Sequence, residues 1–456
     1  MRLFLLLWFI AYTTNIIEAN NFSTAWANFT NDSQLSHATY SMTILDNKTG
    51  NIVFASNKDV GLAPASTLKT ITGAAALHYL GSDYRYETLL QYSGILDDYG
   101  TLDGYIYIVG VGDPTLGSSR WNETNGDTIM DRWAYLINDI GIKECRGIVA
   151  DVSVWSDDTQ TIPDGYLWGD IGNYYGAGSS VLNWRENQFR LILSPGDAVG
   201  KPVTLVALVH PPPSLTIINQ AVTGPPGSGD RTNMYLALDS NHGYLRGSLA
   251  IDLGKNFSIG GAVANSALYV ADELRQKMRW STDTTDLIIL KTEESINAVS
   301  DRFTLDVHHS PPMSDILYWF EQDSINLYGE IIIKTIGHKI SSSSNTILPT
   351  YCQNEHGIEQ TAVATIDGSG LSPENRVTTW TLARVLFDVQ RSSWFPIYQS
   401  ALPIINGIRM KSGYIRNVLS YAGYINKYVF SIIINNFNGD TNVMRQKIWN
   451  LLDTLK

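Results

Sequence analysis

The chain has 456 residues and is poor in the side chains that metal sites and disulfide frameworks require. Its only cysteines, Cys145 and Cys352, lie 207 positions apart (352 − 145), and its eight histidines are scattered. No spacing among these residues matches a zinc-binding motif. We therefore expect no metal and no cofactor. We also expect two unpaired, partly buried thiols, with a disulfide between them as the alternative in an exported protein.

Charge is also scarce, and positive charge is the scarcer kind. Charged residues make up 17% of the chain, and 44 acidic side chains against 32 basic ones give a formal net charge of −12. Proteins that bind nucleic acids need clustered lysine and arginine side chains to neutralise phosphates. The composition therefore argues against a nucleic-acid partner, but it leaves room for a zwitterionic peptide substrate.

A hydrophobic run long enough to cross a bilayer is lacking. The apolar stretch at residues 3–10 follows Arg2 and is shorter than the roughly 18 residues that a membrane span needs. A short apolar core behind a basic residue is typical of an export signal, with Ala19 as the predicted cleavage point. We expect residues 1–19 to be removed and the mature chain to have no transmembrane segment.

What the chain does contain is a serine and a lysine three positions apart at the start of a predicted helix. Ser66 and Lys69 follow Pro64, a residue type favoured in the first turn of a helix. This spacing places both side chains on one helical face, where the lysine amine can reach the serine hydroxyl. A serine hydroxyl needs an adjacent base to become a nucleophile, and lysine can serve when burial and positive neighbours lower its pKa. A surface helix with an ordinary serine and lysine is the alternative.

A second motif, S-x-N, is formed by Ser324 and Asn326 after a predicted helix at residues 314–320. The serine hydroxyl can relay a proton to a leaving group, and the asparagine amide can both donate and accept hydrogen bonds. The alternative is that Ser324 belongs to the N-cap of the following helix.

The third motif is K-S-G, at Lys411, Ser412 and Gly413, in a strand-like run. A lysine and a hydroxyl at a strand edge can hold a substrate carboxylate, and the glycine lets a substrate backbone approach closely. Alone, this motif could also be a strand end followed by a turn. The three motifs together, in this order, are typical of penicillin-binding proteins and serine β-lactamases.

The chain resembles the D-alanyl-D-alanine carboxypeptidases and endopeptidases of the penicillin-binding protein 4 type, which are the low-molecular-mass class C penicillin-binding proteins. The similarity runs from about Tyr40 to the C-terminus. Besides the three motifs, it rests on four segments: residues 112–116 (Gly-Asp-Pro-Thr-Leu), 175–179 (Tyr-Gly-Ala-Gly-Ser), 367–372 (Asp-Gly-Ser-Gly-Leu-Ser) and 422–424 (Ala-Gly-Tyr).

The resemblance implies an α+β fold with a penicillin-binding/serine β-lactamase-like transpeptidase domain, in which helices flank an antiparallel sheet, and a large strand-rich insertion. The length also indicates more than one core. We expect a discontinuous catalytic domain at residues 20–85 and 288–456. Residues 86–287 are expected to form a strand-rich insertion of two small domains, with one helix at residues 263–278. Local patterns predict a hairpin at residues 37–58 and further helices at residues 327–336, 378–389 and 440–455.

The resemblance further implies a serine DD-peptidase that acts on peptidoglycan stem peptides and is acylated by β-lactams. It would remove the terminal D-alanine, or cut D-Ala–diaminopimelate cross-links, through an acyl-enzyme. Ser66 would be the nucleophile and Lys69 its base, although the choice between Lys69 and Lys411 as base stays open. Ser324 would pass a proton to the departing D-alanine. A bacterial periplasm or cell envelope is the implied location.

Substrate binding is assigned by the same resemblance. Lys411 and Ser412 would bind the terminal carboxylate, and the backbone N–H groups of Ser66 and Tyr414 would hold the oxyanion. Gly413 lies between these groups in the motif.

An acidic residue that reads the amine of a diaminopimelate side chain is implied at Asp170, which precedes Tyr175 by five positions. The alternative is a helix cap or a solvated loop. Relatives that prefer a free diaminopimelate side chain place an arginine directly after the Gly-Ser-Gly-Leu-Ser segment, where this chain has Pro373. Arg376 follows three residues later.

Three other functions share parts of this pattern. A β-lactamase or an esterase of the same fold would keep the serine–lysine pair. A non-catalytic peptidoglycan-binding or sensor protein would not need the complete set of motif residues that this chain retains.

Overall fold

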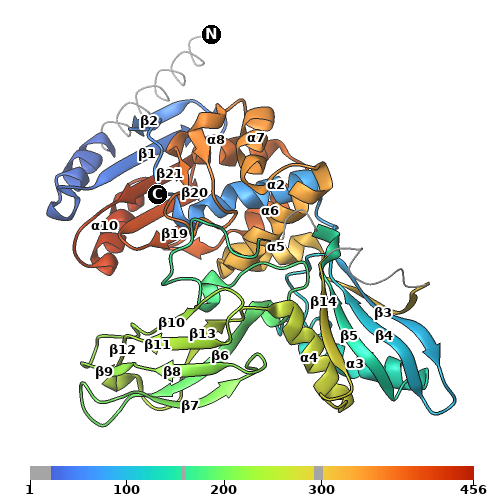
Figure 1. The fold of residues 1–456 in the computed structure, drawn as a ribbon. Helices are drawn as coiled ribbons and strands as arrows, with labels where there is room; N and C mark the ends of the chain where they lie inside the picture. Colours follow the sequence, from blue (N-terminus) through green and yellow to red (C-terminus); the bar gives the residue numbers. More distant parts are fainter. Residues whose placement is uncertain (1–21, 156–159, 292–300) are drawn as a thin grey trace. The chain divides into compact units, whose positions relative to one another are not determined.

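The structure is a computed structural model that describes residues 22–155, 160–291 and 301–456 (Figure 1). The predicted export signal lies outside these residues. Contacts divide the chain into two units, the first formed by Met1–Ser82, Leu317–Ile325 and Lys339–Lys456, and the second by Asp83–Ile316 and Asn326–His338. The domain boundaries given above stay a prediction, and each unit is described by itself.

The first unit is built on a six-stranded antiparallel sheet that joins the two ends of the chain. Its order is β18 (Ile404–Ile405), β19 (Ile408–Ile415), β20 (Val418–Ile425), β21 (Tyr428–Asn435), β1 (Thr39–Asp46) and β2 (Ile52–Ser56). The N-terminal β1 pairs along its whole length with the C-terminal β21. The predicted hairpin at residues 37–58 is confirmed as β1 and β2.

Helices cover both faces of this sheet because its strands alternate between two buried surfaces (Figure 1). Met42 and Ile44 of β1 pack in the cluster that includes the helical residues 22–30 and α10 (Thr441–Asp453). The hydroxyls of Ser41 and Thr43 point the other way and bond to Thr379 at the start of α8 (Thr379–Asp388). The α+β fold class predicted from the sequence is confirmed.

The helix that begins at Lys69, the lysine of the serine–lysine motif, packs with α8. α2 (Lys69–Tyr79) packs against α8, α7 (Ser344–His356) and α9 (Phe395–Ala401). It is buried from Lys69 to Leu77, so it is an interior helix of the unit. The surface-helix alternative for this motif is therefore wrong.

The second unit contains a mixed five-stranded sheet. Its order is β14 (Asp286–Leu290), β5 (Glu144–Asp151), β4 (Thr101–Val109), β3 (Glu87–Leu96) and β15 (Phe303–His309). β5 runs parallel to both neighbours, and the β3–β4 and β3–β15 pairs are antiparallel. α3 (Gly126–Asp139) and α4 (Ser266–Met278) pack on it.

α3 corrects the expectation of a single helix between residues 86 and 287. Asn125 caps it, with its side chain accepting from the N–H groups of Asp127 and Thr128. Its buried side chains recur at helical spacing, at Ile129, Met130, Trp133, Ala134 and Ile137. The 3.6-residue period was therefore present in the sequence, but the many neighbouring strand signals obscured it.

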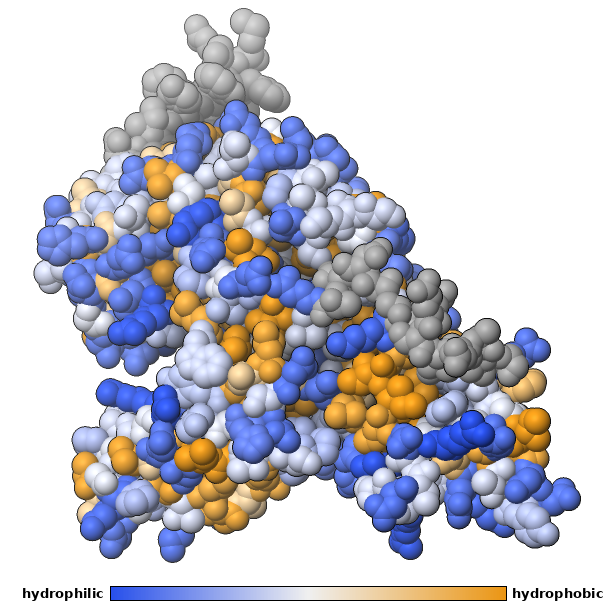
Figure 2. All heavy atoms as spheres, in the orientation of Figure 1, coloured by the Kyte–Doolittle hydropathy of each residue, from blue (hydrophilic) through white to orange (hydrophobic). Residues whose placement is uncertain are grey.

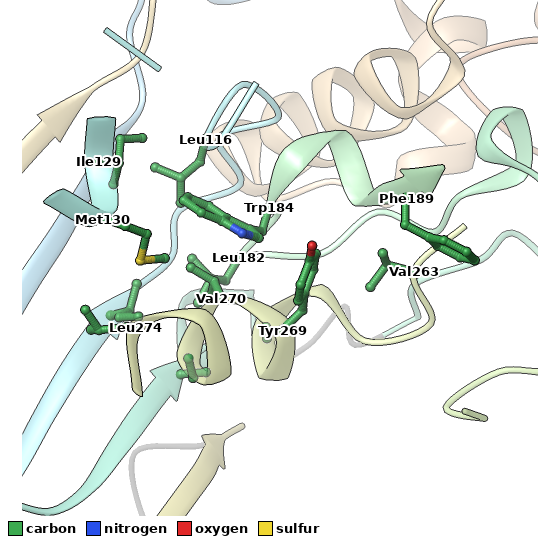
Figure 3. Packing of buried hydrophobic residues seen from close by; sticks show 14 of the residues in the cluster. Leu116, Ile129, Met130, Leu182, Trp184, Phe189, Val263, Tyr269, Val270 and Leu274 are labelled. Carbon is green, nitrogen blue, oxygen red and sulfur yellow. The ribbon is translucent and has the colours of Figure 1, made fainter. Parts of the chain in front are cut away.

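Smaller sheets complete the second unit and share a hydrophobic cluster with the large one (Figure 3). They are β13 (Phe257–Ala262), β6 (Gln188–Ser194) and β7 (Thr204–Val209); β10 (Asn233–Leu236), β11 (His242–Arg246) and β8 (Thr216–Asn219); and β12 (Ser248–Ala250) with β9 (Val222–Gly224). Trp184 lies at the centre of this cluster, with its ring stacked 6.5 Å from Trp133 of α3 and its indole N–H donated to Glu273 of α4.

The two cysteines are free, as predicted, but they are buried and not only partly buried. Burial raises the pKa of both thiols to about 12, so neither is a reactive thiolate near neutral pH. Within the described ranges, no helix combines the length and apolarity that a membrane span requires. On the visible surface, hydrophobic residues lie in separate groups with hydrophilic residues between them (Figure 2).

Candidate active site

The serine–lysine pair lies at the junction of a short 3-10 turn and α2. The turn η2 (Ala65–Leu68) leads directly into α2, with Pro64 at its N-cap position. Lys69 Nζ donates to Ser66 Oγ over 3.0 Å and to the carbonyl oxygen of Ser369 over 2.6 Å. The lysine is fully buried, whereas Ser66 is partly exposed. A buried amine that contacts an accessible hydroxyl is the arrangement that an activated serine requires.

A loop from later in the chain supplies the second contact of that lysine. Asp367 is buried and accepts hydrogen bonds from the N–H groups of Gly370 (2.7 Å) and Ser372 (2.6 Å) and from the amide of Asn375 (2.9 Å). These bonds fold residues 367–372 into a tight loop, and the Ser369 carbonyl faces Lys69. The segment was noted in the sequence only for its family likeness, and its contact with the lysine was missed.

The K-S-G motif lies on β19, directly against the turn that holds the serine. Lys411 and Gly413 are buried, whereas Ser412 and Tyr414 between and beyond them are more exposed, as strand alternation requires. A Cβ added at Gly413 would lie 2.9 Å from the backbone nitrogen of Ser66 and 2.7 Å from the Pro64 oxygen. Glycine is therefore what allows β19 to approach the serine this closely.

Ser324 lies in the short connection between α5 (Met313–Gln322) and α6 (Asn326–Ile340). Its φ of 57° is in the left-handed region, which is unusual for a residue other than glycine and is often found at functional sites. Its neighbour Asp323 interacts electrostatically with Lys411, so Ser324 and the third motif lie in the same part of the first unit.

Lys411 has an unusual electrostatic environment for a lysine. Burial lowers its pKa to about 8, and the carboxyl groups of Glu321 and Asp323 oppose this shift. Glu321 itself is fully buried, and burial raises its pKa to about 7 against the opposing influence of Lys411 and Lys69. We did not single out Glu321 from the sequence. The available signal was a glutamate at the i+4 position from Leu317, on the apolar side of a helix.

Three predicted residues come together in the second unit. Asn326, the first residue of α6, donates its side-chain amide to the Tyr175 carbonyl over 2.7 Å. The Tyr175 hydroxyl lies 3.4 Å from a carboxylate oxygen of Asp170. Burial raises the pKa of Asp170, and the contact with Tyr175 opposes that shift. The N-cap position of the turn Tyr174–Gly176 is occupied by Asn173, so Asp170 is not its cap.

Comparison with known proteins identifies the family. The family model described as D-Ala-D-Ala carboxypeptidase 3 (S13) matches residues 23–455, nearly the whole chain. The chain belongs to this family.

Individual relatives agree with this assignment. A D-alanyl-D-alanine carboxypeptidase from Actinomadura sp. (strain R39) is 25% identical over 448 residues, covering 90% of this chain and 80% of that protein. A penicillin-sensitive carboxypeptidase A from Dictyostelium discoideum is 22% identical, covering 84% and 80%. The crystal structure of penicillin binding protein 4 from Haemophilus influenzae has the same fold, with a TM-score of 0.75 at 21% identity, covering 94% of this chain and 98% of that one.

The S13 assignment makes the protein a serine-type D-Ala-D-Ala peptidase, as the family resemblance implied. Among the described residues, no group of three or more histidine, cysteine, aspartate and glutamate side chains could hold a metal ion.

The close approach of β19 to η2 gives a testable prediction. In Gly413→Ala, the new methyl group would clash with Ser420 Oγ and lie 2.9 Å from the Ser66 nitrogen. We expect the acylation rate by a penicillin to fall by about ten-fold or more, because overpacking here costs on the order of 1–3 kcal/mol. In Gly61→Ala the nearest atom is 3.5 Å away, so this control should acylate normally. A normal rate in Gly413→Ala would mean that β19 does not constrain Ser66.

Proposed function

We propose that this S13 peptidase cleaves the bond after the penultimate D-alanine of peptidoglycan stem peptides through an acyl-enzyme on Ser66. The observation that carries the proposal is the 3.0 Å contact between the buried Lys69 amine and the Ser66 hydroxyl. Because the Ser369 carbonyl also binds the amine, the lysine is held in one orientation toward the serine. β-Lactams, whose amide resembles the scissile bond, would acylate the same hydroxyl.

The proposed acylation step follows from this geometry. Lys69, in its neutral form, takes the proton of the Ser66 hydroxyl as the oxygen attacks the D-alanine carbonyl. The resulting oxyanion is held by the backbone N–H groups of Ser66 and Tyr414, which the close approach at Gly413 supports. Lys69 is assigned as base because it contacts Ser66 Oγ directly.

The remaining roles complete the cycle. Ser324 passes a proton to the nitrogen of the departing D-alanine, with Lys411 nearby. Lys411 and Ser412 bind the terminal carboxylate of the substrate, and water then hydrolyses the ester to free Ser66. Asn326 is proposed to contact the peptide backbone of the substrate, since its amide both donates and accepts.

Products from purified muropeptides test this function. Incubation with monomeric pentapeptides should release free D-alanine, as followed by mass spectrometry. Incubation with cross-linked dimers will show whether the enzyme also acts as an endopeptidase, because monomers would appear. Fast turnover of nitrocefin without loss of D-alanine from any muropeptide would instead indicate a β-lactamase. Ester hydrolysis without penicillin labelling would indicate an esterase.

Because the proposed substrate, peptidoglycan, lies outside the cytoplasm, the enzyme must be exported to act on it. We propose that residues 1–19 direct export to the periplasm or cell envelope. The apolar stretch behind Arg2 supports this proposal.

Asp170 is proposed to contact the free amine on the third residue of the stem peptide. Its partly buried carboxyl is linked through Tyr175 to Asn326, the last residue of the S-x-N motif. In Asp170→Asn, the lost ion pair would cost about 1–3 kcal/mol if it is partly desolvated. We expect cleavage of peptides with a free side-chain amine to fall by about ten-fold or more, while acylation by a simple penicillin stays near normal.

Peptides in which that amine is acetylated provide the matched comparison. They should be cleaved equally by the wild type and by Asp170→Asn. Equal losses with peptide and penicillin would indicate a disturbed fold. Unchanged cleavage of the free-amine peptide would leave Asp170 as an ordinary loop residue.

A further inference from the structure

Glu321 is a buried carboxyl that no hydrogen bond from a described residue satisfies. It lies in the last turn of α5, is fully buried, and neither carboxyl oxygen has a hydrogen-bond partner. Isolated carboxyl groups are rarely buried without partners, because removing them from water costs several kcal/mol. Such a group deserves a functional explanation when it lies beside catalytic residues.

The position of this carboxyl relative to α2 is well defined. A Cβ added at Gly73 would lie 2.9 Å from Glu321 Oε1 and 2.8 Å from a Leu317 methyl group. The carboxyl therefore packs on the backbone of α2 one turn after Lys69, at a point where only glycine leaves room. The Phe320 ring, next to Glu321 on α5, lies 5.7 Å from Lys69 Nζ.

The charged and titratable groups around Glu321 come from three other elements. Lys69 at the start of α2 and Lys411 on β19 both interact with it electrostatically. Tyr398 on α9 also faces it, but burial raises the pKa of this phenol well above its usual value, and its hydroxyl is donated to the Thr70 carbonyl. Tyr398 therefore stays neutral.

Two further carboxylates act on the lysines rather than on Glu321. Asp323, in the segment after α5, acts on Lys411, and Asp367 interacts with Lys69. Asp367 is satisfied by three hydrogen bonds within its own loop. Of the three carboxyls, Glu321 is the one that lies near both lysines with no other bond to make.

We propose that Glu321 is a positioning residue that sets the pH at which the active-site lysines lose their proton, and so the pH range of Ser66 acylation. The inference rests on the proposed function, in which a neutral lysine takes the serine proton. A carboxylate beside two buried amines favours their protonated forms, whereas burial favours the neutral forms. Glu321 thereby offsets part of the effect of burial on Lys69 and Lys411.

The sign of the effect follows directly. Removing the negative charge removes an influence that raises the lysine pKa, so the base becomes neutral at lower pH. In Glu321→Gln, the rising limb of the acylation rate against pH should therefore move to lower pH by about one unit, which corresponds to about 1.4 kcal/mol. The rate on the alkaline plateau should stay within a few-fold of wild type, because Lys69 and Ser66 are unchanged.

The experiment measures the acylation rate constant with a fluorescent penicillin from about pH 5 to about pH 10. This range includes the pKa values of Glu321, which burial raises to about 7, and of Lys411, which burial lowers to about 8. Glu359→Gln is the matched control, because it makes the same charge change at an exposed position of the first unit. Its profile should coincide with that of the wild type. Glu321→Asp, which keeps the charge, should return the limb toward the wild-type pH.

The inference would be overturned if the acylation rate of Glu321→Gln rose at the same pH as that of the wild type. This holds even if the variant is less stable, because a purely structural carboxyl alters unfolding but not the pH profile. Should Glu321→Gln fail to fold, Glu321→Met makes the same charge loss with an apolar side chain of similar length. If the wild type is never labelled at Ser66 at any pH, the proposed function fails instead. If Ser66 is labelled but the pH profile of Glu321→Gln does not shift, the proposed function is supported and only the role of Glu321 is excluded.

Discussion

Replacing Ser66 by alanine is expected to abolish covalent labelling by a fluorescent penicillin. The label requires a nucleophilic oxygen next to a base, and Ser66 Oγ is the hydroxyl that Lys69 Nζ contacts at 3.0 Å. With the oxygen gone, the β-lactam can still bind but has nothing to acylate. Gel fluorescence and intact-protein mass should both show unmodified protein after incubation with excess penicillin.

The matched control for this change is Ser36→Ala, an exposed serine of the same unit. It should be labelled as completely as the wild type. If Ser66→Ala is labelled, or if the wild type never is, then Ser66 is not the nucleophile.

The second large effect is expected at Lys69. Lys69→Ala should slow acylation by about 10³-fold or more, because the serine loses the group that takes its proton. Lys69→Arg should not restore the rate, since a guanidinium remains protonated at every accessible pH and cannot act as a base. Penicillin labelling that is quenched at a series of times gives the acylation rate constants.

Lys58→Ala, at a surface lysine paired with Asp59, provides the control and should acylate normally. Thermal unfolding of the Lys69 variants checks that a fully buried position has been changed without loss of the fold. An arginine variant that acylates at the wild-type rate would remove Lys69 from the base role and leave Lys411, whose pKa burial lowers to about 8, as the other lysine in the site.

Much of the fold around Ser66 could be predicted because it depends on local chemistry. A proline before a run of small residues predicted the helix start, and turn residues between alternating strands predicted the hairpin of β1 and β2. The ranges expected for α4, residues 263–278, and for α10, residues 440–455, lie within a few residues of the observed bounds. In each case the deciding residues are neighbours in the sequence.

Other elements were missed because their sequences carry conflicting local signals. α7 contains Pro349 in its interior and begins in a serine-rich stretch, which together indicate a loop rather than a helix. Tertiary packing makes this segment helical despite its local signals. Ile347, Leu348 and Tyr351 are buried, and α7 packs against α2 and α8.

The candidate site shows the same limit. The serine–lysine contact spans three positions and was predictable, but Lys69 also binds the Ser369 carbonyl 300 positions away, and Asn326 binds Tyr175 151 positions away. Glu321 lies one residue beyond the helix predicted at residues 314–320, and no spacing rule says that its buried carboxyl interacts electrostatically with two lysines. Long-range contacts of this kind are set by the fold, and a single sequence does not encode them in a readable pattern.

The most direct test of the central claim is to find where the substrate itself becomes attached. The protein is mixed with a peptide ending in D-Ala-D-Ala, quenched in acid during turnover, digested with trypsin and mapped by mass spectrometry. We predict an acyl group, equal to the peptide without its last D-alanine, on the fragment of residues 59–69, in which Ser66 is the only serine. D-Alanine release with the acyl group on a different fragment, or at an undiminished rate in Ser66→Ala, would contradict the account.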